Sequence, residues 1–251
     1  LYCAGLYSDL YKTGVGGTFF FTIDAVTDRA SNLVLNKFDE GLLTRLAALK
    51  EPMLRNEEVL RDEVSDMVVR PNGQLILIAE QVFDQSYDTY NNLIITAFDI
   101  GGQVYWTQVV EKNQDFNYNT HGMPAAVYLS DYRQYVMETG YLEQSLENLC
   151  SYALMAPVDK TGIILFYNDD IRNREPGAKR KNFNQPKKSY LLAVKIDAYG
   201  NMTQIPLNAW KKKAMFPEPI RFYDTKSDTL VIPAFRYRKY CYYRIVAPTL
   251  E

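Results

Sequence analysis

Short runs of hydrophobic residues, each ended by a turn motif, recur along most of the chain. Residues 66–82 contain two such runs on either side of Pro71-Asn72-Gly73, and residues 93–110 contain two more around Asp99-Ile-Gly-Gly102. Asn-Gly between hydrophobic runs is a strong hairpin signal, because a type I′ turn requires positive φ at both central positions. The pattern therefore predicts two hairpins, or four antiparallel strands, within residues 65–111.

The second of these hairpins has a counterpart later in the chain. Residues 96–104 and 194–202 share a strand, an Asp, a turn containing Gly and a second strand, and residues 20–24 are a weaker third copy. Repeated four-stranded units are typical of propeller blades, whose sheets bury both faces against their neighbours. We therefore predict an all-β fold: a β-propeller or partial propeller of four-stranded antiparallel blades, with short helical insertions.

The strand-like runs group into four predicted blades of a single domain, at about residues 1–38, 65–111, 150–210 and 218–247. The first lacks its opening strand and the last its closing strand. Since the chain also opens without Met on a strand-like run, we expect it to be a segment of a larger propeller. Within residues 39–62, leucines at helical spacing, divided by Pro52, predict two short amphipathic helices. Their apolar stripe fits docking on a sheet edge or, alternatively, in a partner's groove.

Composition supports a folded globular chain. Hydrophobic residues make up 47% of the 251 positions and charged residues 23%, which disfavours a disordered chain, and 20 Tyr with 12 Phe favour strands. No apolar run approaches the roughly 18 residues needed to cross a bilayer, so no transmembrane segment is predicted.

Charge is unevenly distributed. Residues 1–150 hold 10 Lys and Arg against 21 Asp and Glu, whereas residues 151–251 hold 18 against 9. This asymmetry indicates an oriented contact with a partner, although neighbouring blades could also offset each other. The most basic stretch is the predicted loop 172–188, which carries Arg172, Arg174, Lys179, Arg180, Lys181, Lys187 and Lys188.

Three interpretations of this basic loop remain open: a solvated loop, a contact with anionic lipid headgroups, or a contact with an acidic protein. Nucleic-acid binding is not expected, because stacking platforms are missing apart from Phe183.

Nucleophilic catalysis and zinc chemistry find little support. His121 is the only histidine, and neither Cys-x-x-Cys nor His-Glu-x-x-His is present. Cys3, Cys150 and Cys241 fit small buried hydrophobes, or a Cys3–Cys241 disulfide if the compartment is oxidising. No catalytic residue and no cofactor are therefore predicted.

Acidic and amide side chains gather at predicted strand ends. Glu80, Asp169 and Asp170, with Asn168 and Asn173, are the candidate ligand residues at a propeller mouth. Two convergent carboxylates would suit a glycosidase or lyase. The oxygen-rich segment 168–173 could hold calcium, but it lacks EF-hand spacing, and such runs more often cap turns. Calcium is thus the weaker alternative, and no metal site is predicted.

Several of these motifs occur together in a known pattern. It comprises Asn72-Gly73 before Ala79-Glu80-Gln81, then Tyr90-Asn91-Asn92, Asp99 to Trp106, Lys112-Asn113-Gln114, Ser151-Tyr152, and Phe166-Tyr-Asn168-Asp169 with Asn173. The pattern resembles that of uncharacterised, exported, propeller-like proteins and lipoproteins of the Gram-negative envelope. It spans roughly residues 65–245, and residues 121–149 depart from it.

The resemblance implies a fold and a location but no catalytic residues. We expect a non-enzymatic binding or scaffolding module with a protein partner in an outer-membrane or surface assembly. It implies export, with the protein periplasmic or associated with the outer membrane or cell surface. The alternative is a carbohydrate-active hydrolase or lyase with acids at the propeller mouth.

Overall fold

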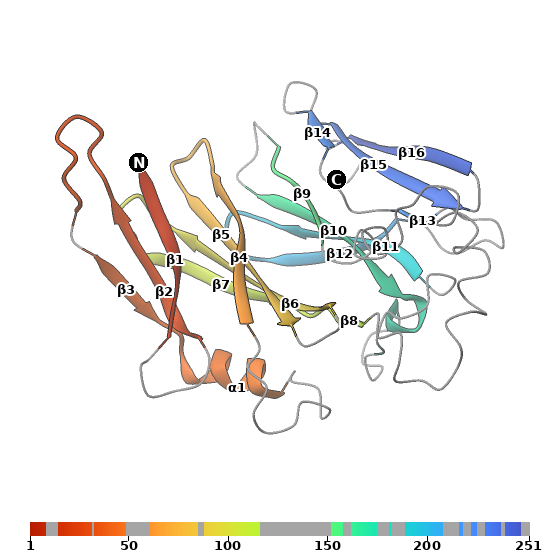
Figure 1. The fold of residues 1–251 in the computed structure, drawn as a ribbon, viewed down its shortest axis with the longest axis horizontal. Coiled ribbons are helices and arrows are strands. Elements are labelled where there is room, and N and C mark those ends of the chain that lie inside the picture. The colour runs from red at the N-terminus through yellow and green to blue at the C-terminus, as the bar shows by residue number, and fades with distance from the viewer. Residues whose placement is uncertain are drawn as a thin grey trace. The chain divides into compact units, whose positions relative to one another are not determined.

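The computed structural model describes residues 1–8, 15–31, 33–48, 61–84, 88–115, 152–157, 162–174, 181, 189–207, 216–217, 222–224, 229–236 and 239–246. As predicted, these residues are mostly strands in antiparallel sheets (Figure 1). By its contacts the chain divides into two compact units. The first is Leu1–Phe83 with Asn92–Glu111, and the second is Asp84–Asn91 with Lys112–Glu251.

The first unit begins with a three-stranded sheet, here called sheet 1. Its order is β1 (Tyr2–Ser8), β2 (Val15–Thr22) and β3 (Val34–Lys37). Helix α1 (Glu40–Ala48) follows, and Asp39 caps it, since the backbone N–H of Leu42 donates to Asp39 Oδ1 at 2.7 Å. The first predicted helix is thus confirmed, whereas the residues of the second lie outside the described ranges.

Sheet 2 holds β4 (Arg61–Val69), β5 (Leu75–Asp84), β6 (Asp88–Phe98) and β7 (Val104–Val110), in that order. The prediction that helical insertion reaches residue 62 is wrong, because β4 already begins at Arg61. In the second unit, the short β8 (Gln114–Asp115) pairs with the start of β6.

The second unit also contains sheets 3 and 4. Sheet 3 has the order β12 (Met202–Pro206), β11 (Ser189–Ile196), β10 (Ile163–Asp170), β9 (Ala153–Met155), and the 3₁₀ turn η1 (Ile171–Arg174) directly follows β10. In sheet 4, β15 (Thr229–Arg236) pairs with β16 (Lys239–Val246) and with the short strands β13 (Phe216–Pro217) and β14 (Phe222–Asp224).

Within each unit, two sheets pack face to face. In the first, Phe20 of sheet 1 packs against Leu75, Leu77 and Phe98 of sheet 2. In the second, a cluster joins Phe166 and its neighbours in sheet 3 to Leu230 and Ile232 in sheet 4. All eight side chains of β10 are buried, as expected of a strand whose sheet is covered on both faces.

Helix α1 docks on sheet 2 through its leucines. Leu46 is buried with Ala79, Ile94 and Val109, and Leu42 and Leu43 pack around the same cluster. Since these partners lie on three successive strands, the helix covers a face of the sheet. Docking on the sheet is therefore confirmed, although the prediction of a sheet edge is wrong. No helix among the described residues is long and apolar enough to span a membrane.

Three hairpins share one turn geometry. The N–H of Arg70, Asp99 and Asp197 donates to the carbonyl four residues on, and the N–H of Gly73, Gly102 and Gly200 donates back. These three glycines have φ of 82°, 84° and 86°. Each loop is a type I turn followed by one left-handed residue, so the predicted type I′ turn at Asn72-Gly73 is wrong. The predicted likeness of residues 96–104 and 194–202 is confirmed.

The Asp side chain secures this turn in each repeat. Asp99 Oδ1 accepts from the N–H groups of Gly101 and Gln103, both at 2.8 Å. Asp197 Oδ1 accepts from Tyr199 and Asn201 at 2.8 and 2.9 Å. At the weaker third copy, Asp24 Oδ1 likewise accepts from Val26 and Thr27, in a loop one residue longer.

Candidate functional site

The candidate site lies where β10 runs into η1. The hydrophobic run of β10 ends in Asn168, Asp169 and Asp170, and all three side chains are buried. Buried carboxylates are rare unless they accept hydrogen bonds or ion pairs. Their partners therefore show what this end of the strand does.

Asp170 is held by an arginine two residues further on. Arg172 Nε donates to Asp170 Oδ1 at 2.7 Å, Arg172 Nη2 donates to Oδ2 at 2.6 Å, and the Arg172 backbone N–H donates to Oδ1 at 2.9 Å. This two-pronged bond to Asp170 raises the pKa of Arg172 above its usual value, against the opposing effect of burial. The Asp170 side chain is 0% exposed and that of Arg172 47%, so the acid serves as an anchor and the guanidinium reaches solvent.

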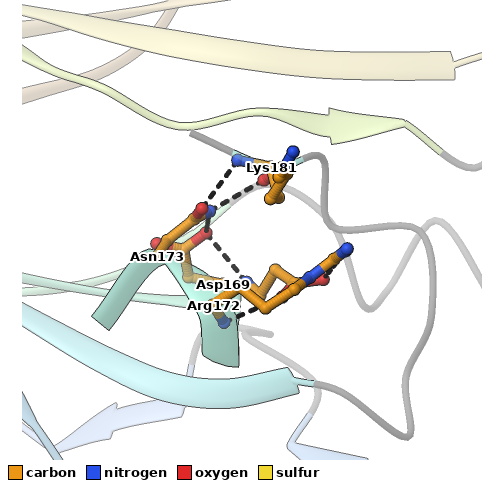
Figure 2. Close-up of polar contacts among 5 residues, drawn as sticks. Asp169, Arg172, Asn173 and Lys181 are labelled. Carbon is orange, nitrogen blue, oxygen red and sulfur yellow. Dashed lines mark hydrogen bonds and ion pairs between the residues drawn. The ribbon is translucent and has the colours of Figure 1, made fainter. Parts of the chain in front are cut away.

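Asp169 and Asn173 form the second contact, which reaches Lys181 across the loop (Figure 2). Asn173 Nδ2 donates to Asp169 Oδ1 and to the Lys181 carbonyl, both at 2.7 Å, while Asn173 Oδ1 accepts from the Lys181 N–H at 2.7 Å. The side-chain amide of Asn173 thus bonds both backbone groups of Lys181, as the backbone of a neighbouring strand would. We call Asp169, Asn173 and the Lys181 backbone the loop clamp.

A buried polar chain approaches the same strand from β8. Lys112 is 1% exposed, and its Nζ donates to Gln114 Oε1 at 2.9 Å. Gln114 Nε2 in turn donates to the Asn168 carbonyl at 2.9 Å. Lys112 and Gln114 therefore support the backbone just before Asp169, and they belong to the site although the sequence did not mark them as candidates.

Glu80 lies in the first unit. It is buried on β5 and stands opposite Glu63 in the β4–β5 ladder. The next residue, Gln81, accepts from Asn92 Nδ2 at 2.8 Å. Asn168, Asp169, Asp170 and Asn173 lie in the second unit. A common mouth for these acids stays a prediction.

The basic loop is described only at its start and at one later residue. Arg172 begins it on η1, Arg174 ends that turn, and Lys181 is exposed while its backbone is held by the loop clamp. Lys179, Arg180, Lys187 and Lys188 lie outside the described residues. So do His121 and Cys150, whereas Cys3 is a free thiol and forms no disulfide with Cys241.

This arrangement is suited to shaping a loop. Both carboxylates already accept protein donors, and a cation at Asp170 would have to displace Arg172. Within the described residues, no group of three or more His, Cys, Asp or Glu side chains gathers as metal ligands would. The turn-capping interpretation of residues 168–173 therefore accounts for the contacts of both acids.

Several of the sequence motifs contribute buried polar residues, in the first unit as well as at this site. Gln81, Asn92, Lys112, Gln114 and Asp169 are all buried polar residues. All five are buried and hydrogen-bonded, so these motif residues stabilise the fold. No protein-family model matches the chain, and no curated protein sequence matches it either.

Proposed function

We propose that this chain is a non-catalytic binding and scaffolding module of a Gram-negative envelope assembly, and that it presents the basic loop 172–188 to an anionic partner. The loop clamp carries this proposal. Asp169 and Asp170 are two of the three acids that the hydrolase alternative would use, yet both are used to fix the start of the loop and its return at Lys181. Holding two points of a loop together in advance strengthens binding, because less conformational entropy is lost in the complex.

The proposal includes a propeller or part of one. It is supported by the three hairpin turns of one geometry, by antiparallel sheets that stack in pairs, and by the complete burial of β10. Propeller sheets bury both faces against neighbours, and their exposed loops commonly bind partners. Propellers also host enzymes, so the fold alone does not distinguish a binding module from a hydrolase. The contacts of the site residues must distinguish them.

The proposal also includes export, with the module periplasmic or associated with the outer membrane or cell surface, as in lipoproteins. Its support is the motif resemblance, which runs through Glu80-Gln81, Lys112-Asn113-Gln114 and Asn168-Asp169. The excess of Lys and Arg in residues 151–251 supports an acidic protein or an anionic surface as the partner.

Binding of the chain to polyglutamate and to phosphatidylglycerol vesicles tests the proposal and distinguishes a protein-like from a lipid partner. We expect Lys179→Glu with Arg180→Glu to weaken binding about thirtyfold, since each cationic residue near an anionic surface contributes about 1 kcal/mol. The matched control, Arg29→Glu with Lys37→Glu, makes the same charge change in the first unit and should bind like the wild type. Affinity should also fall steeply between low and high salt.

A second variant tests the clamp itself. Asn173→Ala removes the three hydrogen bonds of the amide but leaves the charge of the loop unchanged. We expect weaker binding with an unaltered salt dependence, because Asn173 and Lys181 are then no longer held together before binding. Equal affinity of all variants for both probes would refute the proposal. Release of sugars from polysaccharide, lost in Glu80→Gln, would instead establish the hydrolase or lyase alternative.

A further inference from the structure

Strand β1 leaves one of its edges unpaired. Within the described residues it pairs with β2 alone, and sheet 1 has three strands where sheets 2 and 3 have at least four. Leu1 and Ile23 exchange hydrogen bonds in both directions, at 2.8 and 2.9 Å. Since antiparallel ladders alternate, Cys3 and Gly5 also bond to β2. The backbone N–H and C=O groups of Tyr2, Ala4 and Leu6 therefore point to the open edge.

The three turns held by an Asp side chain identify which position beside β1 is open. The Asp24 turn joins β2 to β3 as the Asp99 turn joins β6 to β7 and the Asp197 turn joins β11 to β12. By this correspondence β1 is equivalent to β5 and β10. Each of those strands has partners on both sides, β4 and β6 for β5, and β9 and β11 for β10. The open edge of β1 is therefore the position that β4 and β9 occupy in their sheets.

Nothing in β1 protects this edge from pairing. Its sequence, Tyr-Cys-Ala-Gly-Leu-Tyr-Ser, has no charged residue and no proline, and its register shifts only between Tyr7 and Ser8. Proteins normally protect edge strands with charges, prolines or bulges. Strand β4, which is itself an edge, has four charged residues and a register shift between Val64 and Asp66.

We propose that the open edge of β1 is a strand-acceptor site for an extended, uncharged segment of a partner polypeptide, which runs antiparallel to β1. The inference rests on the proposed scaffolding function and specifies how the partner is held. Strand β9 shows the chemistry: Ala153, Leu154 and Met155 lie antiparallel against β10, with Ala153 and Met155 in the apolar cluster between sheets. Next to Tyr2, Ala4 and Leu6, which also face an apolar cluster, the incoming strand presents small or apolar side chains.

Hydrogen exchange of the full chain, followed by NMR, tests the site amide by amide. Without a partner, the amides of Tyr2, Ala4 and Leu6 should exchange much faster than those of Cys3 and Gly5. A capped peptide with the β9 sequence Tyr-Ala-Leu-Met-Ala, added at millimolar concentration, should slow the three outward amides at least about tenfold. The matched control peptide, Tyr-Ala-Pro-Met-Ala, lacks one N–H donor and should leave them unchanged.

The variant Ala4→Pro separates edge binding from folding. It removes an outward N–H but no hydrogen bond to β2, so the chain should fold as before and no longer respond to the peptide. If the β9 peptide protects no outward amide in the wild type, the acceptor site is excluded. Protection that instead increases with protein concentration and without peptide overturns the partner assignment in favour of a second copy. Because the anionic-partner test reports on a loop of the second unit, either proposal can fail alone.

Discussion

Single aspartates determine much of the local structure. Asp24, Asp99 and Asp197 each follow a strand and accept two backbone N–H bonds across the next turn. Hydrogen bonds from Thr27 and Val26 lower the pKa of Asp24. For Asp197, burial acts to raise the pKa, but the bonds from Asn201, Tyr199 and Gly200 outweigh it, so the pKa is lowered. The carboxylate form is thus favoured by folding.

The lowered pKa of Asp197 makes the stability of its hairpin depend on pH. Because the folded value lies below the unfolded one, the stabilisation is fully present above the unfolded pKa and is lost as pH falls through the folded pKa. We expect the difference in free energy of unfolding between the wild type and Asp197→Asn to shrink as pH falls from about 5 to about 2. Urea titrations across that range measure it. A difference that grows towards acid pH would contradict this account.

Two glycines with the same φ should respond differently to substitution. A Cβ at Gly102 would fall on the ring of Phe20, whereas at Gly73 the nearest atom is Ile100 Cγ2 at 3.1 Å. Gly73→Ala should therefore lose only about 1 kcal/mol through its positive φ. Gly102→Ala should lose about 2–4 kcal/mol, since Phe20 must also move. Chemical denaturation of both variants gives the comparison, and equal losses would show that backbone strain alone determines the effect.

At the scale of elements, the two faces of β2 differ in what covers them. Phe20 is buried between the sheets, with its ring centroid 5.8 Å from that of Phe98. Phe21 points to the opposite face, where it is partly exposed beside Phe19. We expect Phe20→Ala to lower the free energy of unfolding by about 3–5 kcal/mol and Phe21→Ala by about 1 kcal/mol. Urea unfolding of the two neighbours tests this, and a larger loss at Phe21 would mean that the face-to-face packing is assigned to the wrong side.

Hairpins were predictable because their signals are local. Hydrophobic runs and the Asp-to-Gly spacing identified the β6–β7 and β11–β12 hairpins, and the same spacing indicated that they are equivalent. The turn type at Asn72-Gly73 was mistaken because Asn-Gly also fits the end of a three-residue loop. Pro71 favours that loop, since its ring fixes φ near −65° at the first turn position. The pairing of β8 with β6 was not foreseen, because two polar residues carry no hydrophobic period.

The acids and amides of the site were predictable as a group, but their partners were not. Asp169 and Asn173 stood out because oxygen-bearing side chains followed a hydrophobic run. The clamp on Lys181 depends on how the chain returns to η1, which sequence spacing does not reveal. Lys112 was missed because lysines are almost always exposed, and only the folded surroundings show this one to be buried.

At the scale of the whole molecule, the pairing of sheets accounts for the apolar face that each sheet turns toward its partner. Sheets 1 and 2 pack in the first unit and sheets 3 and 4 in the second. The described strands of the four sheets fall within residues 2–37, 61–115, 153–206 and 216–246, close to the predicted blade ranges. Grouping the hydrophobic runs by the turn motifs between them was enough to predict four sheets. Closure into a ring is a long-range property that local patterns do not determine, so the propeller and the single domain stay predictions.

The loop clamp affects which sequence changes the protein can tolerate during evolution. Asn173 holds Lys181 only through its backbone C=O and N–H, and the acids beneath it belong to β10 and not to the loop. Insertions and substitutions between these two points therefore leave the anchor intact, and longer loops add little to the entropy of closure. We therefore expect residues 174–180 to accept substitutions and insertions more readily than Asp169 and Asn173, so that binding specificity can change without a change in β10.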